Sequence, residues 1–248
     1  MSKIDTLMIK GIAITFMLFY HLYLHISAND FCSGFFCIGG LPLAQLITRA
    51  MNPVSFFIIL SGYGLYLSHQ KGMYDVWKKL KGLYVHYWIT LAIFVTLGAI
   101  VKGDRYPGNW TDIINNVTAW SVSYNCEIWF LFPYAMVMLS SKWIVKVLDR
   151  FDPWICLGVT LFLSLCTGYL ISRFGAQYFY RNQFLHKPII YLSFLFPFAI
   201  GAYMAKYKGR LWRAEKAVVG GVILRVPEFQ SLRVSEFLGF KGYGYGWC

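Results

Sequence analysis

The sequence predicts an all-α, polytopic transmembrane helical bundle, and composition, span pattern and charge distribution each favour that fold class. Of the 248 residues, 58% are hydrophobic and 14% are charged. A soluble globular domain has about 45–50% apolar and about 25% charged residues. A chain this apolar cannot keep its whole surface in water. The composition therefore excludes a secreted disulfide scaffold, a disordered chain and an ordinary cytosolic enzyme.

Six apolar segments are long enough, some of them barely, to cross the hydrocarbon core, which needs about 20 mostly apolar residues. The short second segment begins with Pro53, which suits a helix start. The first segment carries Lys10 and lacks a small-residue cleavage site, so we expect an anchored span and not a cleaved signal. The six expected spans are 7–26, 52–68, 83–101, 119–139, 153–172 and 188–206.

Lysine and arginine are unevenly shared between the two sides of these spans. If the N-terminus is cytoplasmic, 14 of the 20 lysines and arginines up to Lys216 fall inside and 6 outside. The positive-inside rule then predicts a multi-pass protein of the cytoplasmic (inner) membrane with its N-terminus inside. Loops 69–82 and 140–152 are expected in the cytoplasm, and loops 27–51, 102–118 and 173–187 outside. The chain has 23 Lys and Arg but only 11 Asp and Glu. Because the basic residues lie between the apolar runs and form no soluble basic face, this excess indicates a lipid bilayer as partner and no nucleic acid.

The six cysteines do not form an obvious framework. Cys126, Cys156 and Cys166 lie inside apolar runs, where cysteine behaves as a small hydrophobe. Cys32 and Cys37 share a short loop, and either form a disulfide, if that loop faces an oxidising compartment, or remain two unpaired thiols. No pair has the spacing of a zinc site, and we expect no metal.

Ionisable groups inside a bilayer are costly, so each is a functional candidate. Lys10 and His21 are eleven residues apart, which places them within about 20° of one helix face and about 16 Å apart along the axis. An imidazole is well suited to exchange a proton near neutral pH. His21 is therefore either catalytic or hydrogen-bonded to a neighbouring helix. His25 is a weaker candidate near the outer interface, and His86 is expected to be a polar interface residue.

Three further positions carry candidate chemistry. Glu127 is the only acidic residue within the six apolar runs, and a carboxylate there must be protonated, paired or in contact with water. It is a candidate acid/base or substrate-orienting residue, or a structural hydrogen-bond partner. Lys78 and Lys81, one turn apart at the inner face, can bind the phosphates of an anionic cofactor or serve only as topological charge. Ser61 is a candidate acyl nucleophile, although Ser and Gly in such spans more often allow close helix packing.

Four segments together resemble the bacterial integral-membrane acyltransferase family, acyltransferase type three. KIDTLMIKGIAITFMLFYH (3–21) resembles its first span, in which a basic residue precedes a histidine by eleven positions. FFIILSGYGLYLS (56–68) resembles its second-span signature, WSVSYNCEIWFLFP (120–133) a later segment with an acidic residue, and FAIGAYMAKY (198–207) a later span.

This resemblance implies an enzyme that transfers an acyl group, in the first place acetyl from acetyl-CoA or another acyl-CoA, to a hydroxyl of a glycan or glycolipid of the cell envelope. It implies that His21 is catalytic, and we then expect Glu127 either to orient the imidazole and fix its tautomer or to bind the acceptor. It also implies that Lys10, Lys78 and Lys81 hold the anionic donor, since Lys78 and Lys81 stand where the family carries an arginine pair. The alternatives are a non-enzymatic membrane transporter fragment and an inactive acyltransferase remnant.

The resemblance also bears on domain organisation. Residues 1–210 are expected to form the N-terminal part of the acyltransferase domain. Members of the family have about ten spans of the usual length, so this chain with six is expected to be truncated at its C-terminus. Residues 211–248 contain no segment long enough to span and end in a cluster of glycine and aromatic residues. We expect an atypical tail, either a truncated end or one that departs from the parent reading frame.

Overall fold

The computed structural model describes residues 3–24, 37–38, 41–50, 52–73, 75–101, 103, 106 and 108–208. This part of the chain is helical apart from one short antiparallel strand pair and the connecting turns, as expected for an all-α bundle. The elements are α1 (Lys3–Leu24), β1 (Cys37–Ile38), β2 (Leu41–Pro42), α3 (Leu43–Ala50), α4 (Pro53–Gln70), α5 (Val76–Val101), α6 (Trp110–Val117), the 3₁₀ turn η1 (Cys126–Ile128), α7 (Leu131–Arg150), α8 (Pro153–Phe174), α9 (Ala176–Arg181) and α10 (Gln183–Lys206).

Within the described residues, 5 helices are long and apolar enough to cross a membrane, and α1 contributes a shorter apolar stretch, Leu7–Tyr23. Five of the six expected spans overlap the observed long helices closely. The fourth is shifted, because the candidate span covers Cys126–Arg150, with α7 at Leu131–Arg150, and not 119–139. Pro133 lies in the first turn of this helix, the place that proline favours because its missing N–H is not needed there.

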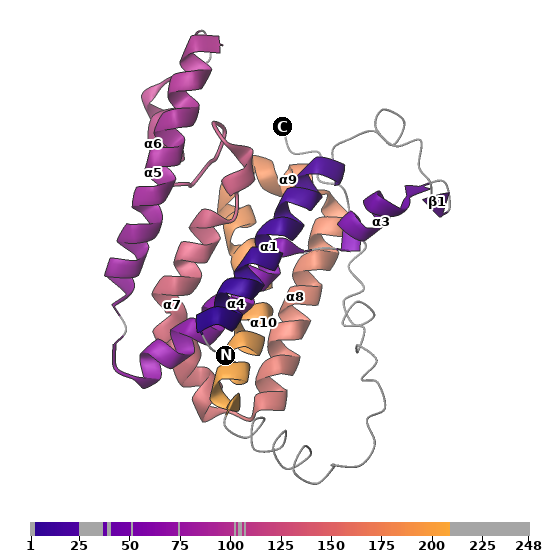
Figure 1. Cartoon of the computed structure of the whole chain (residues 1–248), viewed down its shortest axis with the longest axis vertical. Coiled ribbons are helices and arrows are strands. Elements are labelled where there is room, and N and C mark those ends of the chain that lie inside the picture. Colours follow the sequence, from indigo (N-terminus) through magenta and orange to yellow (C-terminus); the bar gives the residue numbers. More distant parts are fainter. Residues whose placement is uncertain are drawn as a thin grey trace.

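Helix α10 lies at the centre of the bundle and packs against α4, α7 and α8, while α1 lies across α4 (Figure 1). Half of the residues in the most apolar 18-residue stretch of α10 are buried in the bundle, compared with 11% of those in the corresponding stretch of α5. Helix α5 contacts α7 but otherwise stands to one side and projects past the bundle together with α6 (Figure 1). The core is therefore the α4–α7–α8–α10 cluster, and most of α5 is left for lipid.

Two glycines set the distance between α4 and α10. A Cβ on Gly62 would overlap the backbone carbonyl of Phe198, and one on Gly201 would overlap the carbonyl of Ile59. Small residues at such crossings allow membrane helices to approach until their backbones touch. This contact supports the interpretation that the Ser-Gly step of the second span serves close packing.

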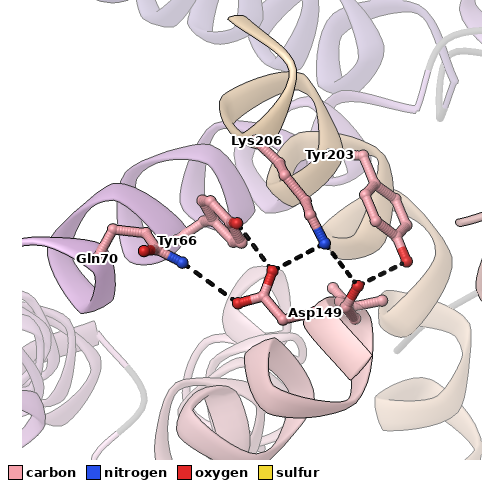
Figure 2. A network of polar contacts seen from close by, with 6 residues as sticks. Tyr66, Gln70, Asp149, Tyr203 and Lys206 are labelled. Carbon is pink, nitrogen blue, oxygen red and sulfur yellow. Dashed lines mark hydrogen bonds and ion pairs between the residues drawn. The ribbon is translucent and has the colours of Figure 1, made fainter. Parts of the chain in front are cut away.

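A carboxylate joins three helix ends at one end of the bundle (Figure 2). Asp149, at the end of α7, accepts hydrogen bonds from Tyr66 Oη at 2.9 Å and Gln70 Nε2 at 3.2 Å on α4, and it pairs with Lys206 Nζ on α10 at 2.9 Å. Lys206 Nζ and the Tyr203 hydroxyl also donate to the carbonyl of Leu148. The ends of α4, α7 and α10 and the starts of α5 and α8 meet there. We call this the basic end, because these helix ends carry Lys71, Lys78, Lys79, Lys81, Lys146 and Lys206.

We expect Gly201→Ala to destabilise the protein, because the added methyl group must push α10 away from the carbonyl of Ile59. Overpacking of this kind typically costs about 1–3 kcal/mol. Thermal unfolding in detergent measures the effect. Gly64→Ala is the matched control, since a Cβ at Gly64 on α4 meets nothing within 4 Å. Equal unfolding midpoints for the two variants would contradict the close contact of α4 and α10.

Candidate active site

The structure brings His21 and Glu127 into direct contact. Nδ1 of His21, in the last turn of α1, lies 3.1 Å from Oε2 of Glu127. The two side chains are 35% and 56% exposed at the surface of the helical bundle. A carboxylate that accepts from one imidazole nitrogen fixes the tautomer and leaves the other nitrogen free to exchange protons. The arrangement can therefore perform acid/base chemistry on a hydroxyl.

Glu127 is not in the middle of a membrane helix, which corrects the sequence-based expectation. It lies in η1, within the irregular segment that leads into α7. The side chain of Asn125 caps this turn by accepting from the N–H of Glu127 at 3.2 Å. The Ser, Asn and Pro residues of WSVSYNCEIWFLFP were the available signal for such a turn. The carboxylate therefore lies on a 3₁₀ turn at the start of the candidate span Cys126–Arg150, with its side chain 56% exposed.

Three side chains of α5 hold the chain just before this segment. The hydroxyls of Tyr84 and Tyr87 donate to the carbonyls of Thr118 and Asn116, and the indole N–H of Trp88 donates to the carbonyl of Val117 at 3.0 Å. Tyr87 is eleven residues into α5, about 16 Å from the start of the helix and about 21 Å from its end. Helix α6 therefore returns from the far end of α5 to its middle and delivers the Glu127 segment at that level.

Asn116 organises the turn that follows α6. Its side chain is fully buried and donates to the carbonyl of Asp112 at 2.8 Å and to Ser123 Oγ at 2.9 Å, while its Oδ1 accepts from the N–H of Tyr124 at 3.0 Å. Ala119, also fully buried, has a positive φ of 59°. Burial raises the pKa of the Tyr124 phenol, and Asp112 acts in the same direction. Sequence reasoning missed Asn116, because nothing in its local pattern distinguishes it from Asn115.

The three predicted donor-binding lysines are not brought into contact with His21. Lys10 is exposed on the same continuous helix as His21. Lys78 and Lys81 are exposed in the first two turns of α5, at the basic end. Between them, Lys79 donates to Ser68 Oγ of α4 at 3.0 Å. The structure thus separates a polar pair on one side from a group of cations on the other.

The remaining candidates have local partners or fall outside the described residues. Ser61 Oγ and Tyr134 Oη are 2.8 Å apart, which links α4 to α7. His86 Nδ1 lies 2.7 Å from the carbonyl of Gly82 in the preceding turn of α5 and is exposed. His25 lies outside the described residues.

The cysteines differ from expectation at one position. Cys156 is buried and Cys166 half-buried, and both are free thiols, as expected of small apolar residues. Cys126 is disulfide-bonded, so it is not a free, small apolar residue like the other two. Its place in η1, next to Glu127, explains the difference, because this turn lies outside the helix. Whether Cys32 pairs with Cys37 or both remain thiols falls outside what the structure describes.

In the part of the chain that the structure describes, no group of three or more His, Cys, Asp or Glu side chains is arranged to hold a metal ion. The chain matches the family model described as an acyltransferase domain, type three, over residues 4–224. It belongs to this acyltransferase family. Comparison with curated proteins found no match, and comparison with solved structures found none either.

The family match covers every candidate residue of this membrane acyltransferase, including both members of the His21–Glu127 pair. The pair joins two parts of the acyltransferase that are about a hundred residues apart in sequence, the end of the first long helix and the turn before α7. Within the acyltransferase domain, these are two of the segments on which the resemblance rests.

We expect Cys126 to resist alkylation until the acyltransferase is reduced. Under denaturing, non-reducing conditions, a thiol reagent should modify Cys156 and Cys166 but not Cys126, because of these three only Cys126 is in a disulfide. Mass spectrometry of the alkylated peptides measures this and identifies the partner thiol. Modification of Cys126 in protein that was never reduced would show that the disulfide is absent.

Proposed function

We propose that this acyltransferase moves an acyl group, in the first place acetyl, from acyl-CoA to a hydroxyl of a cell-envelope glycan or exopolysaccharide. The observation that carries the proposal is the His21–Glu127 pair, accessible at 35% and 56% exposure and 3.1 Å apart. A hydroxyl is a poor nucleophile until a base takes its proton. An imidazole oriented by a carboxylate is suited to that step.

In this mechanism Glu127 accepts the Nδ1–H of His21, so that Nε2 is the basic nitrogen. Nε2 takes the proton of the acceptor hydroxyl while the oxygen of that hydroxyl attacks the thioester carbonyl carbon. When the tetrahedral intermediate collapses, the C–S bond breaks and the protonated imidazole returns its proton to the leaving thiolate. The products are the O-acyl ester and free CoA. Glu127 is not consumed, and it stabilises the imidazolium that forms between the two steps.

The donor is proposed to bind from the basic end through Lys10, Lys78 and Lys81. All three are exposed, as residues that meet a soluble anion must be. A lysine acts on a phosphate as a point charge and lacks the bidentate geometry of arginine. Lys10 lies about 16 Å from His21 along α1, so the thioester arm of the donor would extend along this helix toward the imidazole.

The proposed location is the cytoplasmic membrane, with the basic end and the N-terminus inside. Two independent observations support this orientation. Of the 20 lysines and arginines up to Lys216, 14 fall on the proposed inner side and 6 on the other, as the positive-inside rule favours. The disulfide at Cys126 lies beside Glu127, away from the basic end, and disulfides persist in oxidising compartments outside the cytoplasm.

We expect His21→Ala to abolish acyl transfer while expression and membrane insertion are unchanged. Loss of a general base typically lowers the rate by about 10²–10⁴-fold. Glu127→Gln keeps the shape of the side chain but removes its charge, and should lower the rate by about 10–100-fold, as loss of a partner that orients a histidine does. Membranes expressing each variant are given labelled acetyl-CoA, and envelope polysaccharide is assayed for ester-linked label.

His86→Ala is the control, because His86 bonds only to its own helix and is exposed to one side of α5. Its rate should equal that of the unmodified protein. If His21→Ala kept more than about a tenth of the rate, His21 would be structural and not the general base. Absence of ester-linked label even with the unmodified protein would contradict the proposed function itself.

We also expect Lys78→Ala with Lys81→Ala to weaken acyl-CoA binding, and the residual binding to depend less on salt. Fewer cations then face the phosphates, and surface attraction is screened by ions. Binding of acyl-CoA to purified protein at two ionic strengths measures this. Lys142→Ala with Lys146→Ala, two exposed lysines of α7, is the control, because it removes the same number of charges. An equal loss in both variants would mean that these lysines act only through net charge.

A further inference from the structure

We propose that Asn116 is a positioning residue that sets Glu127 against His21. This inference rests on the proposed function for its effect on rate, but its geometric part can be tested without activity. Asn116 touches neither member of the pair. It acts through the turn between α6 and α7, whose course determines where η1 and Glu127 lie.

The bonds of Asn116 span this turn. The side-chain amide nitrogen donates to the carbonyl of Asp112 at 2.8 Å, earlier in the chain, and to Ser123 Oγ at 2.9 Å, later in the chain. The amide oxygen accepts from the N–H of Tyr124 at 3.0 Å. Glu127 follows Tyr124 by three residues, and the cap formed by Asn125 occupies most of that interval. A single side chain therefore fixes the start of the turn to the residue from which the Glu127 segment departs.

The same residue fixes the turn to α5. The backbone carbonyl of Asn116 accepts from the Tyr87 hydroxyl, and the carbonyls of the next two residues accept from Trp88 and Tyr84. The amide is fully buried, so a lost bond cannot be replaced by water, and an unsatisfied buried polar group is costly. Asparagine is suited to this place because only an amide supplies two donors and an acceptor on so short a side chain.

The first test is a double-mutant cycle on activity. Asn116→Ala should lower kcat as much as Glu127→Gln, with the KM for acyl-CoA unchanged, because the donor end is untouched. Combined with Glu127→Gln, it should cause no further loss, since the two changes remove the same effect. Asn115→Ala is the matched control, as only the backbone carbonyl of Asn115 is used, and it should leave kcat unchanged. Losses that multiply in the double variant would overturn the proposal.

The second test needs no substrate. Glu127→His places two histidines together, and imidazoles are good ligands for Ni²⁺. Ni²⁺ should then raise the unfolding midpoint in detergent, since a metal that binds only the folded state stabilises it. The shift should persist when Asn115→Ala is added and vanish when Asn116→Ala is added. A shift that survives Asn116→Ala would overturn the positioning role. No shift in Glu127→His alone would overturn the contact between His21 and Glu127, and with it the basis of the proposed function.

Discussion

The close contact of α4 and α10 is the constraint on which the rest of the structure depends. Gly62 and Gly201 let the two backbones touch, and only at that distance can Tyr66 and Gln70 of α4 share Asp149 with Lys206 of α10. This shared carboxylate fixes the end of α7. Because α7 is a rigid helix, its start is fixed as well, and Glu127 lies just before that start. A packing contact near the middle of the bundle thus supports the position of a side chain near His21.

The fold was largely predictable from the sequence, because the need to place about 20 apolar residues across a bilayer dominates every other preference. The exception is instructive. The segment 119–139 satisfies the hydropathy criterion, yet Pro133 and the Asn116 network redirect its first half into a turn. A hydropathy average over about 20 residues measures how apolar a segment is, but it takes no account of where the backbone can form helical hydrogen bonds. Pro133 was visible in the sequence, whereas the partners of Asn116 were not.

The candidate site was predictable only in part. His21 and Glu127 stood out because ionisable side chains are expensive in apolar runs, and the structure brings them to 3.1 Å. Nothing in their spacing of about a hundred residues indicates contact. The oxidation of Cys126 was missed for the same reason as the turn, since a cysteine in an assumed span is taken for a small hydrophobe. Sequence patterns identify costly residues, but only tertiary structure shows which of them share a site.

The central claim is that donor binding and hydroxyl activation take place at opposite ends of the bundle. The donor binds at the basic end, and His21 activates the hydroxyl nearer the opposite end. Sidedness tests this claim directly. Labelled acetyl-CoA, which does not cross membranes, is added to inverted and to right-side-out membrane vesicles that contain the protein and the envelope glycan. Ester-linked label should form only in inverted vesicles, which expose the basic end, and it should be lost with His21→Ala. Label formed equally in both preparations, or only in right-side-out vesicles, would contradict the account.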